Sequence, residues 1–310
     1  MLSRITSKEI QTAESRPGDV PAARGGGTLH AHRVMLVVQA FTALSGADHG
    51  PSEIAAATGL NVAVVYRILQ SGISTSIFLR VPPGRYRLGP GAARIGMQAM
   101  AATPNVSAAR PVLERLSRVV DGLALLWVLS PYGGPRKACA ASAPGRYDFE
   151  SLGLSVADLI EVGQSLRVGA SGRVIAAHLP PFLVSAVLEQ PFPVAGVGPG
   201  AVRDAGKFTA SLGGVREAGY AVSREEIPGW SAVAAPVMWG DTVYGAVSVL
   251  KPSSLMPGDL ALPIAATTAA AERLTLLASG ESDLHPVADM RHLVPVATGS
   301  TSRQEGSARP

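Results

Sequence analysis

Three stretches of apolar residues near the start of the chain predict three helices. Apolar side chains between positions 31 and 44 cover more than one helical face, which is typical of a buried helix. A short helix is expected over Glu53–Thr58, and a third over residues 61–71. Because only the turn Gly59-Leu60 separates these two, the pattern predicts a helix-turn-helix.

The residues at the expected helix ends agree with this prediction. Ser52 and Asn61 are expected to be N-caps, because their side-chain oxygens can accept hydrogen bonds from free backbone N–H groups. Gly59 suits the left-handed conformation that ends many helices. Gly72 is expected to loosen the end of the third helix by about 1 kcal/mol through backbone entropy.

Two short alternating segments then predict a β-hairpin. Ile77–Val81 and Arg85–Leu88 read as strands, joined by a turn at Pro82-Pro83-Gly84. Tyr86 and Leu88 are expected in the core. Three helices followed by a hairpin make a winged helix, and arginines of such a wing can hold phosphate or enter a minor groove.

The distribution of charge singles out the same part of the chain. The 310 residues carry a net charge of +4, yet residues 1–103 have a balance of +5 and residues 104–310 a balance of −1. No acidic residue occurs from Ile54 to Leu113. Unopposed arginines suit a surface that binds a polyanion, because each neutralised phosphate releases counterions. A solvated basic face without a partner is the alternative.

The pattern after position 107 is a mixture of helical and alternating segments. Helices are expected over Val112–Val120, Ser171–Leu179, Phe182–Leu188, Ala205–Ala218 and Leu260–Leu277, and strands over Leu123–Ser130, Arg136–Ser142, Tyr220–Ser223, Ala232–Trp239 and Thr242–Leu250. The turn Gly240-Asp241 joins the last two strands. The fold class is therefore α+β with an antiparallel sheet.

The two ends of the chain lack a sustained apolar pattern. The expected organisation is a disordered tail over 1–29, a winged helix-turn-helix domain over 30–89, a linker helix over 90–106, a second domain over 107–278 and a second tail over 279–310.

Several classes of protein are excluded by composition and spacing. One cysteine, Cys139, cannot make a disulfide framework or a cysteine-rich zinc site, and the histidines lack metal-ligand spacing. The longest charge-free runs have fifteen residues, short of the roughly 18 that indicate a membrane helix. The sequence around Ser171 lacks the spacing of a nucleophile elbow. We expect a cytoplasmic protein with no catalytic activity, metal or cofactor.

The chain resembles the isocitrate-lyase-regulator (IclR) family of bacterial transcription factors. The similar segments are Ser52–Ala55, Thr58–Leu60, Val65–Leu69, Gly84–Gly89, Leu166–Ala177, Val215–Val222 with Glu225-Glu226, Ala232–Val237 and Ala246–Val249. They occur in the family's order over residues 31–278. The resemblance implies a GAF-like effector-binding domain after the linker helix, and assembly into a homodimer or homotetramer.

The resemblance and the helix-turn-helix together give a set of expected DNA-binding residues. They are Ser52, Asn61, Val62, Ala63, Val64, Tyr66, Arg67, Arg80, Arg85 and Arg87. The family commonly has Pro-Lys-Ser-Thr at the start of the recognition helix, where this chain has Asn61-Val62-Ala63-Val64. Base readout is therefore expected to rely on thymine methyl contacts, Asn61, Tyr66 or Arg67.

The resemblance also implies an effector cavity between the sheet and the loop before the Gly172 helix. The matching residues are Ala170, Ser171, Gly172, Ser223, Ala232, Ser248 and Leu250. Backbone N–H groups at Ala170, Ser171 and Gly172 are expected to open toward an anionic group at a helix N-terminus. With few hydroxyls, the cavity suits a small, largely apolar organic acid or lactone.

We therefore expect a ligand-responsive transcriptional regulator that binds double-stranded operator DNA, with an affinity modulated by a small molecule in the second domain. The alternative is a small-molecule sensor or scaffold whose basic N-terminal domain binds an acidic protein partner.

Overall fold

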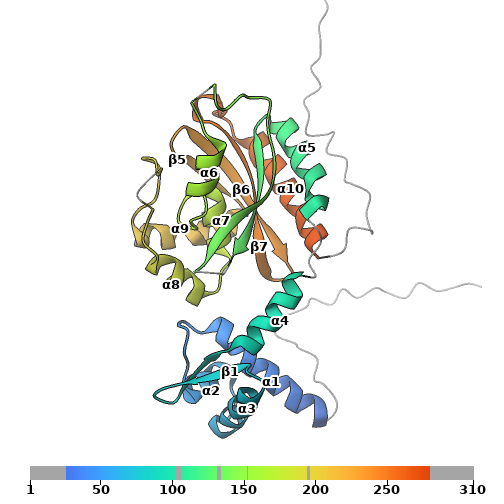
Figure 1. Cartoon of the computed structure of the whole chain (residues 1–310), viewed down its shortest axis with the longest axis vertical. Helices are drawn as coiled ribbons and strands as arrows, with labels where there is room; N and C mark the ends of the chain where they lie inside the picture. The colour runs from blue at the N-terminus through green and yellow to red at the C-terminus, as the bar shows by residue number, and fades with distance from the viewer. Residues whose placement is uncertain (1–25, 102–105, 131–133, 152, 194–195, 280–310) are drawn as a thin grey trace, which may run out of the picture.

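The computed structural model describes residues 26–101, 106–130, 134–151, 153–193 and 196–279. A smaller N-terminal unit is joined through one helix to a larger unit that holds a central sheet (Figure 1). The expected tails fall almost wholly outside the described residues, as do residues 102–105 of the expected linker. Residues 26–29 are helical, however, so the expected tail boundary at 29 is wrong there.

The N-terminal unit has the predicted order of elements. They are α1 (Gly26–Ala43), α2 (Pro51–Thr58), α3 (Val62–Ser74), β1 (Phe78–Val81), β2 (Arg85–Leu88) and the connecting α4 (Pro90–Ala101). One buried cluster, which includes Val37, Ile54 and Leu69, holds the three helices and the hairpin together. The winged helix-turn-helix is confirmed.

The caps of the helix-turn-helix are partly as predicted. Asn61 Oδ1 accepts a hydrogen bond from Ala63 N at 2.8 Å, and Gly59 ends α2 with φ at 69°. Ser52 is not an N-cap, because α2 begins at Pro51 after Gly50. A proline has the right φ for a first helical position, and the Gly50 N–H donates to Glu53 Oε2 at 3.2 Å instead.

Gly72 has a packing role that its entropy cost does not reveal. A Cβ at this position would lie 2.3 Å from Phe78 Cδ2, so the glycine makes room for a buried ring. That ring stacks on Phe41 with 5.3 Å between the centroids. Tyr86 is buried as predicted, whereas Leu88 is exposed at the end of its strand, so its predicted core position is wrong.

The larger unit is built on a five-stranded antiparallel sheet in the order β4-β3-β7-β6-β5. The strands are β3 (Leu123–Ser130), β4 (Arg136–Ala143), β5 (Ala221–Ile227), β6 (Trp230–Trp239) and β7 (Thr242–Pro252). The short turn at Gly240-Asp241 is confirmed. β5 continues four residues beyond the expected end at Ser223.

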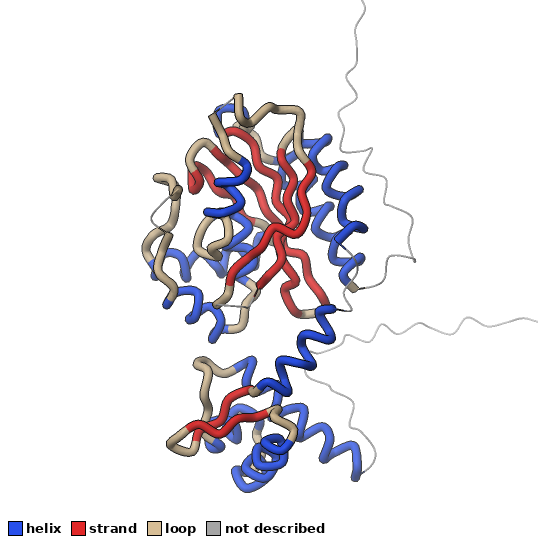
Figure 2. The backbone as a smooth tube through the Cα atoms, viewed as in Figure 1, coloured by secondary structure: helices blue, strands red, loops and turns tan. Residues whose placement is uncertain are grey.

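Helices cover both faces of this sheet (Figure 2). The helices are α5 (Arg110–Val120), α6 (Val156–Val162), α7 (Gly169–Ala177), α8 (Pro181–Glu189), α9 (Ala205–Ala218) and α10 (Ala261–Ala278), with 3-10 turns at Val106–Ala109 and Ser253–Leu255. α5 and α10 pack on one face, and α7 and α9 on the other, around two separate buried clusters. α6 was not expected. The α+β class with an antiparallel sheet is confirmed.

Among the described residues, no single helix is long and apolar enough to cross a membrane. The pair Pro51–Thr58 and Val62–Ser74 meets that length and composition only when its two helices, bent by 115°, are counted together.

The Gly72 packing gives a first test. We expect Gly72→Ala to lower the free energy of unfolding of the winged helix by about 1–3 kcal/mol, because its Cβ overpacks the Phe78 ring. Gly96→Ala is the matched control, since a Cβ there meets nothing within 4 Å and should stabilise α4 by up to about 1 kcal/mol. Urea denaturation of both variants measures this. Equal stability of the two variants contradicts the packing argument.

Candidate DNA interface and effector pocket

The bend between α2 and α3 creates one exposed surface at the start of α3. The two helices meet at 115°, within the range of helix-turn-helix motifs. A shallow depression there is lined by Pro51, Ser52, Asn61, Val62, Ala63, Tyr66 and Arg67. Six of the expected DNA-binding residues therefore lie together, and we name them the reading face.

Val64 does not belong to the reading face. Its side chain packs against the core cluster and lines a groove on the other side of α3. Within the reading face, Val62 and Tyr66 are about half exposed. Arg67 Nε donates to Ala63 O at 3.3 Å along its own helix, with the guanidinium at the surface.

Arg85 has a different environment from the one expected. Its guanidinium donates to both carboxylate oxygens of Glu53 at 3.0 Å and also to the Asp48 carbonyl. These hydrogen bonds hold the pKa of the Glu53 carboxyl below its usual value. A bidentate pair of this kind fixes geometry. Arg85 therefore ties the wing to α2 and is not presented as a free cation.

Arg80 and Arg87 are exposed but lie on opposite faces of the wing. Arg80 pairs with Tyr86 across the hairpin, and Arg87 pairs with Leu79 one rung away. Successive rungs point to opposite sides of a hairpin. The two arginines therefore project from opposite faces of the wing.

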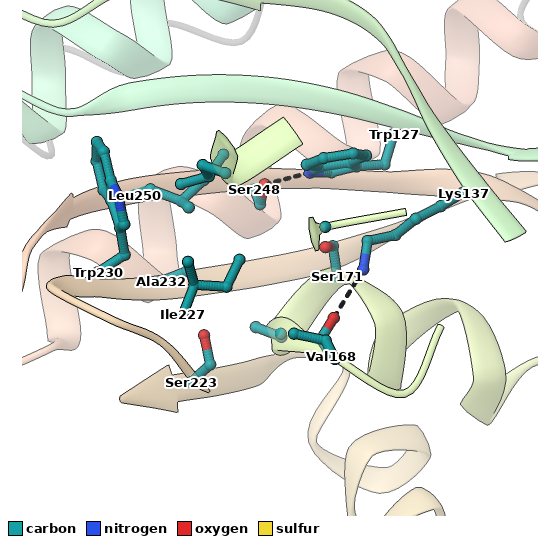
Figure 3. A pocket seen from close by; sticks show the side chains of 14 residues that line it. Trp127, Lys137, Val168, Ser171, Ser223, Ile227, Trp230, Ala232, Ser248 and Leu250 are labelled. Carbon is teal, nitrogen blue, oxygen red and sulfur yellow. Dashed lines mark hydrogen bonds between the residues drawn. The ribbon is translucent and has the colours of Figure 1, made fainter. Parts of the chain in front are cut away.

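The expected effector residues converge on a cavity between the sheet and α7 (Figure 3). Its lining includes Ala170, Ser171, Ser223, Ala232, Ser248 and Leu250. The remaining lining residues, which were not predicted, are Trp127, Lys137, Leu159, Gly163, Val168, Gly169, Ile227 and Trp230. Of the seven expected positions, Gly172 alone does not line it.

The cavity is small, and hydrogen bonds hold side chains of its walls in place. Its volume is about 20 Å³, which is room for about one water molecule. Trp127 Nε1 donates to Ser248 Oγ at 3.1 Å across neighbouring strands, so the Ser248 O–H is left to donate elsewhere. A ligand larger than water therefore requires the apolar side chains of Leu159, Ile227 or Leu250 to move.

The N-terminus of α7 already holds an internal anion. Gly169 N donates to Glu226 Oε2 at 2.8 Å, and the other oxygen of this carboxylate pairs with Arg173 Nη1. Both side chains are buried. The N–H groups expected to face an effector are those of Ala170, Ser171 and Gly172, so Glu226 from β5 occupies only the preceding N–H group, that of Gly169.

Lys137 on β4 is the feature of the pocket that sequence reasoning missed. Its side chain is almost fully buried, and its Nζ donates to Ser165 O at 2.8 Å and Val168 O at 2.7 Å. Burial lowers the pKa of its ammonium to about 7, against an opposing effect of Glu226. A Cβ at Gly172 would lie 2.5 Å from Leu166 O and 3.1 Å from this Nζ, so the glycine makes room for the Leu166 carbonyl and also for the lysine.

A signal for Lys137 exists in the sequence. The chain has only four lysines, and Lys137 and Lys251 lie in segments read as strands or adjoining one. A lysine on a half-buried strand is unusual enough to mark a site. Among the described residues, no cluster of His, Cys, Asp and Glu is suited to a metal ion.

The chain thus has a winged helix-turn-helix followed by a GAF-like domain with an internal cavity. Residues 155–274 match the family described as "Bacterial transcriptional regulator IclR C-terminal". Over those residues the larger unit is similar to the C-terminal domain of the IclR family of bacterial transcriptional regulators. No curated protein matches the chain.

Solved structures of several regulators are similar to this chain. A putative ICLR regulator from Silicibacter sp. TM1040 is 26% identical over 79% of this chain and 95% of its own, with a TM-score of 0.48. A regulator from Alicyclobacillus acidocaldarius is 25% identical over 81% and 98%, with a TM-score of 0.48. An IclR homolog complexed with 4-hydroxybenzoate, from Microbacterium hydrocarbonoxydans, is 22% identical over 81% and 99%, with a TM-score of 0.48.

The lowered pKa of Lys137 gives a second test. An unfolded lysine titrates near 10.4, so between about pH 7 and 10 the unfolded chain binds more protons than the folded chain. The free energy of unfolding of the parent should therefore rise with pH over this range, relative to Lys137→Met. Chemical denaturation at several pH values measures the difference. Lys251→Met removes another buried lysine and should show the same rise in the free energy of unfolding as the parent. If this free energy changes with pH in the same way in the parent and in Lys137→Met, the lowered pKa of Lys137 is contradicted.

Proposed function

We propose that this chain is a ligand-responsive transcriptional regulator that binds operator DNA with sequence specificity. The observation that carries the proposal is the reading face, where six expected side chains share one exposed surface at the start of α3. In helix-turn-helix proteins the N-terminal residues of the second helix contact base edges in the major groove. The match of residues 155–274 to the C-terminal domain of the IclR family supports the same assignment.

The side chains of the reading face suggest how bases are read. Arg67 suits a guanine edge, and the apolar Val62 and Ala63 suit thymine methyl groups. Tyr66 suits a phosphate contact. On the wing, both Arg85 and Arg87 were expected to contact the DNA backbone, and Arg87 is the one proposed to do so, because Arg85 is engaged by Glu53.

Exposed apolar side chains support assembly into a homodimer or homotetramer. Met35 on α1 and Ile95 and Met97 on α4 are about half exposed or more. Covering them between two chains would place two reading faces on two half-sites of one operator. An effector can then change DNA affinity by changing how the two chains of the dimer are placed relative to each other.

The cavity is proposed as the effector site, for a small organic acid or lactone. Its apolar lining with a few polar groups is typical of a ligand site. The 4-hydroxybenzoate bound by the Microbacterium hydrocarbonoxydans homolog provides a first probe for this chain. We propose no catalytic step, and a regulator of this kind works in the cytoplasm, where the DNA is.

A gel-shift assay with DNA from the region that flanks the gene tests the proposal. Sequence-specific binding that weakens with salt is expected. Binding that is independent of sequence, or no binding, would instead favour the alternative of a sensor or scaffold whose basic domain contacts an acidic protein.

Arg67→Ala tests the reading of bases. Each good bidentate base contact contributes about 1–3 kcal/mol of discrimination, so specific affinity should fall by roughly tenfold or more, with little change in non-specific affinity. Fluorescence anisotropy with operator and scrambled DNA measures both. Arg110→Ala is the matched control, because Arg110 is an exposed arginine that pairs with Glu114 on α5. Unchanged operator affinity of Arg67→Ala removes this residue from the interface.

Arg87→Ala tests the wing contact. Loss of one phosphate contact should weaken binding to every sequence and reduce the slope of log affinity against log salt by about 1. Salt titrations of parent and variant measure the slope. An identical slope shows that Arg87 makes no phosphate contact.

A further inference from the structure

The buried charges beside the effector pocket do not cancel. Lys137 and Arg173 are both buried, and Glu226 is the carboxylate that acts on them among the described residues. That carboxylate is already engaged by Arg173 and by the Gly169 N–H. The protonated form of Lys137 is therefore uncompensated in the interior, where an unpaired charge is costly, and the lysine loses its proton near pH 7 unless an anion is beside it.

Among the described residues, the hydrogen bonds of Lys137 also leave part of its ammonium group without an oxygen acceptor. An ammonium group has three N–H donors. Lys137 uses two of them on the backbone carbonyls of Ser165 and Val168. Among the residues that the structure describes, these two carbonyls are its oxygen acceptors; the Nζ also lies 5.3 Å from the centroid of the Trp127 ring, and the side chain lines the cavity (Figure 3).

The rest of the cavity suits an acid with an apolar body. The Ser248 hydroxyl accepts from Trp127 and keeps its own hydrogen for a ligand oxygen. The indole rings of Trp127 and Trp230 and the side chain of Leu250 supply apolar walls. A carboxylate next to Lys137 would balance the charge, and its apolar part would need the side chains of Leu159, Ile227 or Leu250 to move, because the enclosed volume is about 20 Å³.

We propose that Lys137 is the residue that selects the effector, by pairing its ammonium group with the effector's carboxylate. The pocket then takes a carboxylic acid and discriminates against a lactone or amide of the same shape. This proposal rests on the cavity being the effector site, as proposed above, but not on DNA binding.

Lys251 provides a matched control for Lys137. It is also buried, donates to a backbone carbonyl, Val120 O, at 3.0 Å, and lies over the Tyr147 ring. It does not line the cavity. Lys251→Met therefore removes a buried ammonium of the same kind without altering the pocket.

The test is calorimetry of the full chain with acids and their neutral counterparts. The probes are benzoate against benzamide and 4-hydroxybenzoate against 4-hydroxybenzamide. The parent and Lys251→Met should bind the acid at least about tenfold more tightly than the amide, because a desolvated charge pair contributes this much or more. Lys137→Met should lose that preference, and Lys137→Arg should retain part of it.

Three results would overturn the proposal: an acid preference that survives in folded Lys137→Met, a parent that prefers the amides, or a parent that binds neither class. The parent comparison needs no variant, so it holds even if Lys137→Met does not fold. The gel shift reports separately on the regulator assignment. A chain that selects acids through Lys137 but ignores DNA would defeat the proposed function and leave this inference standing.

Discussion

The ion pair between Arg173 and Glu226 is the interaction on which the effector domain depends. Helix α7 is buried over nearly its whole length, so an arginine on it must find an internal partner. Glu226 comes from β5 and also accepts the Gly169 N–H at the start of the helix. Removing one partner of such a buried pair typically costs about 3–5 kcal/mol, because the other charge is left uncompensated.

The same pair sets the position of the pocket. By fixing the start of α7 it places the carbonyls of Ser165 and Val168, and these hold the ammonium of Lys137. Gly172 completes the arrangement by leaving space where a side chain would meet that ammonium. Glu226 is thus paired with Arg173, whereas the nearby ammonium group of Lys137 is proposed to pair with a ligand.

Under the proposed function, a ligand in this pocket can control DNA binding only by favouring one of two arrangements of two reading faces. The chain connects the two units through α4, which begins directly after the wing. Arg85 makes the wing rigid by joining it to α2. In a dimer of the proposed kind, a change in the effector domain would therefore act by altering how two winged helices are placed relative to each other.

The local pattern of the sequence predicts most of this fold. Apolar periodicity gives the helix-turn-helix, the hairpin and the antiparallel sheet, and α9 has the bounds that were expected. The face at the start of α3 follows from the same pattern, because a helix fixes which side chains share a side. The family resemblance supplies the effector positions, six of which line the cavity.

What the sequence does not show are partners that are distant along the chain. Glu226 reads as a polar residue at a strand end, because its partner lies 53 positions away, and β5 was therefore expected to stop at Ser223. Arg85 looks like a free cation until Glu53 is placed beside it, and Lys137 looks like a surface lysine until α7 covers it. Gly72 looks like a weak point until the Phe78 ring is seen against it.

The central claim is that an acid paired with Lys137 sets the DNA affinity of the whole chain. Anisotropy titrations of operator DNA, with and without 4-hydroxybenzoate, test it most directly in the parent and in Lys137→Met. The account predicts equal affinity of the two proteins without acid and an acid-dependent change in the parent alone. The same change in both proteins would contradict it.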